Sequence, residues 1–135
     1  CKEVGIKTLA DFMLGNPTET MEDIRMTFDL MHKIDPDYVQ YSICSPYPNT
    51  KLYEMALERR MFPNDVWKEF ALNPLSRFES PMWLEHFTKK ELVKLTKQAY
   101  RQFYFNPRFV WKQLLKLKSW DRLKVMAKGA VGMLR

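Results

Sequence analysis

Two turns in the sequence carry residue types that could bind a ligand at the end of a strand. The first contains Gly15, within DFMLGNPTET, and the second contains Ser45-Pro46, within ICSPYPNT. A strand that ends in glycine lets the backbone approach a flat or anionic ligand, because no Cβ stands in the way. Ligands of parallel α/β folds lie at the carboxyl ends of the strands, where both turns fall. The spacing fits a ligand site and a plain connection equally, and it matches neither GxGxxG nor a phosphate-binding loop.

Acidic residues around the first turn could supply acid–base chemistry. Glu22 and Asp23 fit a simpler role, since they follow Thr20 and favour the positive end of a helix. Asp11 interrupts an apolar strand, and a buried acid needs a partner. We therefore expect Asp11 near the polar end of its strand or facing a lumen.

Metal-binding and nucleophilic motifs are missing from the sequence. His32 and His86 have no His or Cys at ligand spacing, and no catalytic triad can be assembled. Cys44 fits a small buried apolar residue, and Cys1 an ordinary thiol. Two cysteines argue against a disulfide framework and favour a cytoplasmic setting. No apolar run approaches the length of a membrane span, and no signal-peptide pattern opens the chain.

The elements that position these residues alternate between strand and helix. Residues 6–14 end in the run Phe-Met-Leu and predict a strand buried on both faces. A helix capped by Thr18 or Thr20 follows, with an apolar face that extends to Met31. Proline after residue 35 ends it.

A second strand and helix repeat this order. Residues 38–44 are aromatic and β-branched, which predicts a strand. Asn49 or Thr50 caps a short helix after it. Two βα units imply parallel strands joined by a right-handed crossover, so residues 1–61 are expected to form an α/β unit.

The rest of the chain has a different texture. Residues 62–87 are rich in proline and aromatic residues without a clear period, which predicts an irregular packed connector. Residues 88–135 predict a helical extension, with a capping box at Thr88, a second helix starting at Asn106-Pro107 and a third at Ser119.

Charge divides the chain at about the same place. Residues 1–85 carry 9 Lys/Arg and 14 Asp/Glu, a net charge of −5, whereas residues 86–135 carry 13 Lys/Arg and two acids, a net charge of +11. The basic extension interleaves lysines with aromatic residues. It fits a non-enzymatic module that binds nucleic acid or a membrane surface, and it also fits a helical cap with solvated lysines.

The stretches GIKTLADFMLGNPTETMEDIRMTFDL and DPDYVQYSICSPYPNTKLYEMA resemble the last two βα units of a radical S-adenosylmethionine enzyme. The resemblance is to the cobalamin-associated group that includes anaerobic magnesium-protoporphyrin monomethyl ester cyclases and Fe–S oxidoreductases. It covers residues 3–60, and a weaker resemblance extends over residues 87–117. It implies the last two βα units of a partial (β/α)6 TIM-like barrel followed by an α-helical C-terminal extension.

The resemblance implies a role for five residues in binding S-adenosylmethionine: Met13, Leu14, Gly15, Ser45 and Pro46. In the family, the turns after these strands have the forms G-x-P-G-E-T and Ser-Pro-x-Pro-Gly-Thr. Here Thr18 and Asn49 stand where the family commonly has glycine. Glu19 matches the turn pattern, with a structural role expected rather than a catalytic one.

The resemblance also implies a [4Fe–4S] cluster, with cobalamin left open. The family holds its cluster with a Cys-x3-Cys-x2-Cys motif, which this sequence does not contain. We therefore expect a fragment that needs the remainder of the barrel to act on a small-molecule substrate and is inactive alone. An apolar sheet face left by the missing strands would be covered by a second copy or by the chain's own tail.

Overall fold

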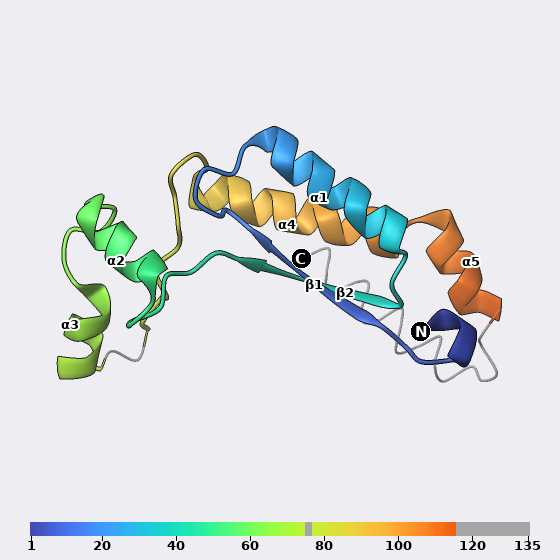
Figure 1. Ribbon diagram of the computed structural model, residues 1–135, viewed down its shortest axis with the longest axis horizontal. Coiled ribbons are helices and arrows are strands. Elements are labelled where there is room, and N and C mark those ends of the chain that lie inside the picture. The colour runs from blue at the N-terminus through green and yellow to red at the C-terminus, as the bar shows by residue number, and fades with distance from the viewer. Residues whose placement is uncertain (75–76, 116–135) are drawn as a thin grey trace.

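A two-stranded parallel sheet with helices along it forms the centre of the structure (Figure 1). The computed structural model describes residues 1–74 and 77–115. Its elements are a 3₁₀ turn (Lys2–Val4), β1 (Leu9–Leu14), α1 (Met21–Ile34), β2 (Tyr38–Ile43), α2 (Lys51–Glu58), α3 (Val66–Leu72), α4 (Lys89–Tyr104) and α5 (Pro107–Leu115). The strands are in register from Leu9 opposite Tyr38 to Leu14 opposite Ile43. The two predicted strands thus form a parallel pair.

Side-chain caps fix where the helices begin. Thr20 and Asp23 form a capping box at α1, and Thr88 and Glu91 form one at α4. In each box the threonine hydroxyl accepts from the third helical amide, and the carboxylate accepts from the threonine amide. Thr50 caps α2 in the simpler way, with its hydroxyl alone. These caps confirm the starts predicted for the three helices.

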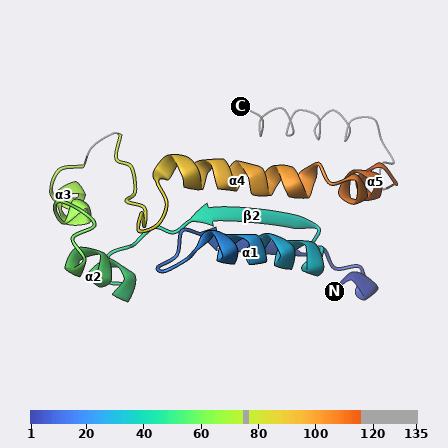
Figure 2. The same cartoon turned by 90° about the horizontal axis from the view of Figure 1, so that it is seen from above.

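Both long helices pack on the same face of the sheet. In Figure 1 α1 and α4 lie above the strands, and in Figure 2 β2 lies between them. The core between helices and sheet consists of Leu14, Ile24, Phe28, Met31, Val39, Tyr41, Leu92, Leu95, Ala99 and Phe103. Burial of these side chains supplies the main driving force that holds the layers together.

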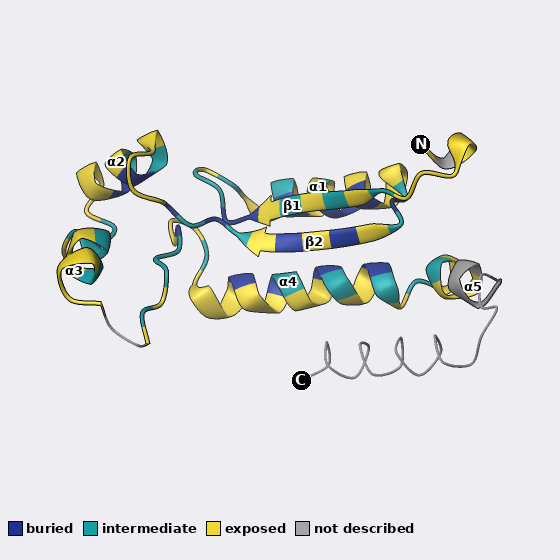
Figure 3. Ribbon diagram, turned by 90° about the horizontal axis from the view of Figure 1, so that it is seen from below, coloured by how far each residue is buried: buried dark blue, intermediate teal, exposed yellow. Residues whose placement is uncertain are grey.

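The other face of the sheet is open, and the prediction that the first strand is buried on both faces was wrong. Exposure alternates along the strands, because helices cover one face only (Figure 3). Phe12 and Leu14 point toward the helices, and Met13 between them is 49% exposed. The exposed side, called the open face below, carries Leu9, Asp11, Met13, Tyr38, Gln40 and Ser42. It is mixed in polarity rather than apolar.

The outer edge of β2 is closed by tyrosines of α4. The Tyr41 amide donates to the Tyr100 hydroxyl at 3.0 Å, and the Tyr104 hydroxyl donates to the Val39 carbonyl at 3.3 Å. These hydroxyls occupy the place at which a further strand would pair with β2. The described part of the basic extension therefore packs on the same face of the sheet as α1. It does not cover the open face, although the chain's own tail was one of the two covers predicted for that face. Coverage by a second copy stays a prediction.

The helix that covers β2 is α4, and not the short helix that follows β2 in the chain. That helix, α2, packs away from the sheet, where Ala56 joins Cys44 and Trp83 in a second small core. The eight residues of α2 offer little apolar surface, and α4 offers four buried side chains and two tyrosines. Packing of α4 on β2 therefore buries more apolar surface than packing of α2 would.

The connector is not irregular throughout, because it contains α3. Asp65 caps this helix by accepting from the Lys68 amide at 3.1 Å. The indole nitrogen of Trp67 donates to the Pro46 carbonyl at 2.9 Å, which fastens α3 to the second turn. The helix predicted from Ser119 lies outside the described residues. Within the described ranges, no helix combines the length and apolar character that crossing a bilayer requires.

Candidate functional site at the carboxyl ends of the strands

The open face offers three cross-strand pairs that a ligand could contact. In register along the strands they are Leu9 with Tyr38, Asp11 with Gln40, and Met13 with Ser42. Met13 with Ser42 lies toward the carboxyl ends, where parallel α/β folds bind their ligands, and Asp11 with Gln40 lies near the middle of the strands. A carboxylate, an amide and a hydroxyl beside a thioether can hydrogen-bond a polar group and contact an apolar one.

Glu19 braces the first turn through its carboxylate. Its carboxylate accepts from the Gly15 amide and from the Asn16 amide, the latter at 3.2 Å. The Asn16 side chain in turn donates to the Met13 carbonyl at 3.0 Å. The structural role expected for Glu19 agrees with these contacts.

Gly15 is needed for packing within the chain. Its φ is 80°, in the left-handed region. A Cβ built there would lie 2.9 Å from one methyl carbon of Leu92 and 3.2 Å from the other. Because Gly15 has no side chain, the first turn of α4 can pack closely against its backbone. No free space for a ligand remains on that side of Gly15.

Thr18 and Asn49, the two residues at which the resemblance implies glycine, both adopt left-handed backbone angles. Thr18 has φ of 63° and Asn49 has φ of 59°. Asparagine tolerates this region, whereas a β-branched residue is strained there. The Thr18 amide donates to Glu85 at 3.0 Å, which helps to hold the strained turn.

The second turn is held by the connector that returns over it. The Ser45 hydroxyl lies 2.7 Å from that of Ser80 and donates to the Pro81 carbonyl. The Trp83 amide donates to the Cys44 carbonyl at 2.9 Å, so the connector continues alongside the strand end. The Ser45 hydroxyl therefore has no proton left to donate to a ligand, because it donates its one proton to this segment.

Glu85 joins the first turn to the second core, and nothing in the sequence singled it out. Besides the Thr18 amide, its carboxylate accepts from the Trp83 indole at 3.0 Å and pairs with Arg59 at 2.5 Å. The hydrogen bond from the Thr18 amide is the main reason why the pKa of Glu85 lies below its ordinary value of 4.5.

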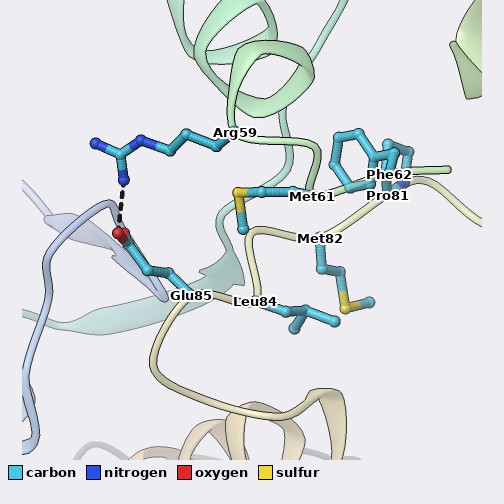
Figure 4. Close-up of a pocket in the computed structure, with 7 residues that line it drawn as sticks. All are labelled: Arg59, Met61, Phe62, Pro81, Met82, Leu84 and Glu85. Carbon is cyan, nitrogen blue, oxygen red and sulfur yellow. Dashed lines mark hydrogen bonds and ion pairs between the residues drawn. The ribbon is translucent and has the colours of Figure 1, made fainter. Parts of the chain in front are cut away.

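A cavity of about 500 Å³ opens beside this ion pair (Figure 4). Its lining is otherwise apolar and consists of Met61, Phe62, Pro81, Met82 and Leu84. Because Arg59 and Glu85 neutralise each other at its rim, the cavity suits an apolar group rather than a charged one.

The structure brings the five predicted cofactor-binding residues to the same end of the sheet but buries most of them. Leu14, Gly15 and Pro46 are buried, and Ser45 is half-buried. Met13 alone among the five is exposed, on the open face. Gln40 and Ser42, which share that face, were not predicted. The alternation of side chains along the second strand could have placed them there.

No metal site is formed by the described residues. Within residues 1–74 and 77–115 no three His, Cys, Asp or Glu side chains come together as ligands for an ion. Burial raises the pKa of the Cys44 thiol, which suits the small apolar residue predicted at this position.

Comparison with known proteins finds relatives that carry enzyme names. An uncharacterized methyltransferase of Pyrococcus horikoshii is 33% identical over 114 residues, which are 84% of this chain and 24% of that protein. The anaerobic magnesium-protoporphyrin IX monomethyl ester cyclase of Rubrivivax gelatinosus is 25% identical over 109 residues, 81% of this chain and 18% of the cyclase. A Methanocaldococcus jannaschii protein named provisionally as a methylthiotransferase is 33% identical over 67 residues, 50% of this chain and 15% of that protein.

The chain is related to segments of these enzymes. It spans a quarter or less of the length of each relative that it matches. No family model matches the chain. No solved structure matches it either.

Proposed function

We propose that this chain forms the last two strands of a partial (β/α)6 barrel in a radical S-adenosylmethionine enzyme, followed by a helical extension. The open face would be part of the inner wall of that barrel, and α1 and α4 part of its outer layer. The parent protein would be an Fe–S oxidoreductase of the group that includes porphyrin cyclases. The names of the three relatives support this assignment to an enzyme of that kind.

The two sheet edges support a position at the end of the barrel. The β2 edge is closed by Tyr100 and Tyr104, whereas in the described residues β1 pairs with β2 alone. Further strands can therefore be added only beside β1. This asymmetry is expected of the last strand in an open barrel, and it is the observation that carries the proposal.

The turn geometry supports the same assignment. A left-handed angle at Thr18 and at Asn49 is what a glycine in either position would adopt most easily. The turns would thus keep a backbone shape that suits glycine although the glycines are replaced.

The residues fit S-adenosylmethionine in part. Met13 would contact the adenosyl group, and Asp11, Gln40 and Ser42 would hydrogen-bond polar groups of the cofactor or the substrate. Leu14, Gly15 and Pro46 are buried, so they would support the barrel wall by packing and would not contact the cofactor. In the complete enzyme the cofactor supplies a radical that removes a substrate hydrogen. Cobalamin, where the parent uses it, would bind outside this chain.

The residues do not fit the [4Fe–4S] cluster. Cys44 is buried in the second core and Cys1 is exposed in the 3₁₀ region at the other end of β1, so they cannot share a cluster. The cluster would be bound by the remainder of the parent protein, and the chain alone would be inactive.

The parent gene provides the first test. The sequence that encodes the protein upstream of Cys1 should contain Cys-x3-Cys-x2-Cys. A parent protein without these three cysteines would contradict the proposal. Purified under anaerobic conditions, the parent should also bind S-adenosylmethionine in equilibrium dialysis, and the 135-residue chain should not.

A further inference from the structure

The outward side of α4 is a row of cations interrupted by exposed apolar residues. This row, called the cationic face, consists of Lys90, Val93, Lys94, Lys97 and Arg101 of α4 and of Phe105, the C-cap residue that follows the helix. Steps of three and four residues put all six on one side of the helix, where they line one shallow groove. The buried residues of α4 lie on the side that packs on the sheet (Figure 3).

The charge of this face selects an anionic partner. Glu91 is the single acid of α4, and its carboxylate is held in the capping box with Thr88. Residues 1–85 carry a net charge of −5, so the field of the molecule directs α4 toward a negative surface. Like charge disfavours a second copy of the face as its cover.

The apolar members of the face favour lipid over nucleic acid. Val93 is 38% exposed and Phe105 is 48% exposed, and Trp111 in the middle of α5 is 63% exposed. A valine side chain has no stacking partner on a nucleic acid, where cations and aromatic rings do the binding. The boundary between headgroups and acyl chains accepts valine and the aromatic rings alike.

We propose that the cationic face of α4 docks on an anionic lipid surface. Lys90, Lys94 and Arg101 would contact headgroup phosphates and carboxylates, while Val93 and Phe105 enter the boundary with the acyl chains. The inference does not depend on the radical enzyme assignment, because it uses only α4, α5 and the distribution of charge.

Sedimentation of the full chain with vesicles tests the proposal. The chain should bind phosphatidylserine/phosphatidylcholine vesicles and be released by salt, and it should bind pure phosphatidylcholine at least tenfold more weakly. Each lysine near an anionic surface strengthens binding about fivefold, so Lys90→Gln with Lys94→Gln should weaken it roughly 25-fold. Lys33→Gln with Lys51→Gln removes the same charge from exposed positions on α1 and α2 and should leave affinity unchanged. Circular dichroism confirms that each variant is folded.

Val93→Ser separates lipid from nucleic acid. It should weaken vesicle binding several-fold and leave binding to a single-stranded oligonucleotide unchanged. Tighter binding to the oligonucleotide than to the vesicles would overturn the proposal, as would equal binding to both kinds of vesicle or to neither. Acetylation of Lys90 and Lys94 should be slowed by phosphatidylserine vesicles. Slow acetylation without vesicles would mean that protein already covers the face, and this too would overturn it.

Discussion

The carboxylate of Glu85 accepts a hydrogen bond from the backbone amide of Thr18, 3.0 Å away, across 67 residues of sequence. The same carboxylate pairs with Arg59 at the end of α2, and the Arg59 guanidinium lies 5.5 Å from the centre of the Trp83 ring. One side chain thus joins the strained first turn to the small core under the second turn. Glu85 therefore helps to hold the two turns in place beside each other.

Glu85 should make the chain sensitive to acid. Its pKa is lowered in the folded state, mainly by the Thr18 amide, so the folded chain binds fewer protons than the unfolded chain. The stabilisation is complete above pH 4.5 and is lost as pH falls through the lowered pKa. Urea unfolding at several pH values should show that Glu85→Gln is less stable at pH 7 but loses less on acidification.

Glu58→Gln is the matched control for this prediction. It removes one exposed carboxylate from the last residue of α2 and should keep the wild-type dependence on pH. If Glu85→Gln and the wild type lose stability in parallel below pH 4.5, the carboxylate does not hold the turn.

Thr18→Gly should stabilise the chain. Removing a β-branched side chain from a residue with φ of 63° relieves about 1 kcal/mol of backbone strain. Part of this gain is lost, because glycine raises the conformational entropy of the unfolded chain. The free energy of unfolding in urea measures the net gain. Thr27→Gly, inside α1, should instead lose stability, by about 0.3 kcal/mol from helix propensity alone. Equal losses at both positions would show that Thr18 is not strained.

Gly15→Ala should cost about 2–4 kcal/mol, from the left-handed backbone and from the clash with Leu92. Gly5→Ala is the control, because Gly5 also has a positive φ but its added Cβ would meet nothing within 4 Å. It should cost about 1 kcal/mol from the backbone alone. Both values are measured by urea unfolding.

Leu92→Ala should reveal the contact directly. Alone it removes a buried side chain and costs about 2–5 kcal/mol. Combined with Gly15→Ala, it should cost at least 1 kcal/mol less than the sum of the two, because the clash is gone. If the cost of the double variant equals the sum of the two single costs, Leu92 and Gly15 are not in contact.

Local patterns predicted the helix starts well, and long-range packing decided the rest. The box at Thr88 is complete within four residues and was predicted from the sequence, which left Thr18 and Thr20 open as the cap of the first helix. The cover of β2 depends on Tyr41 meeting Tyr100, 59 residues away, and no local pattern encodes that contact.

The candidate site was predicted in place but not in detail. The turns at Gly15 and Ser45 do end the two strands, and Cys44 is buried as predicted. That Leu92 fills the space beside Gly15 could not be foreseen, because it depends on how α4 lies against the sheet. The exposed pair of Met13 and Ser42 follows from strand alternation, once one face is known to be open.

The central claim is that the open face lines the site for S-adenosylmethionine in the parent protein. The direct measurement is S-adenosylmethionine affinity of the complete protein, prepared anaerobically, with Met13→Asp compared with Met26→Asp. Met26 on α1 is 56% exposed and Met13 is 49% exposed, so both variants place the same new charge at similar exposure. We predict at least tenfold weaker binding for Met13→Asp and unchanged binding for Met26→Asp. Equal affinity of both variants and the wild type, or no binding by the complete protein, would contradict the account.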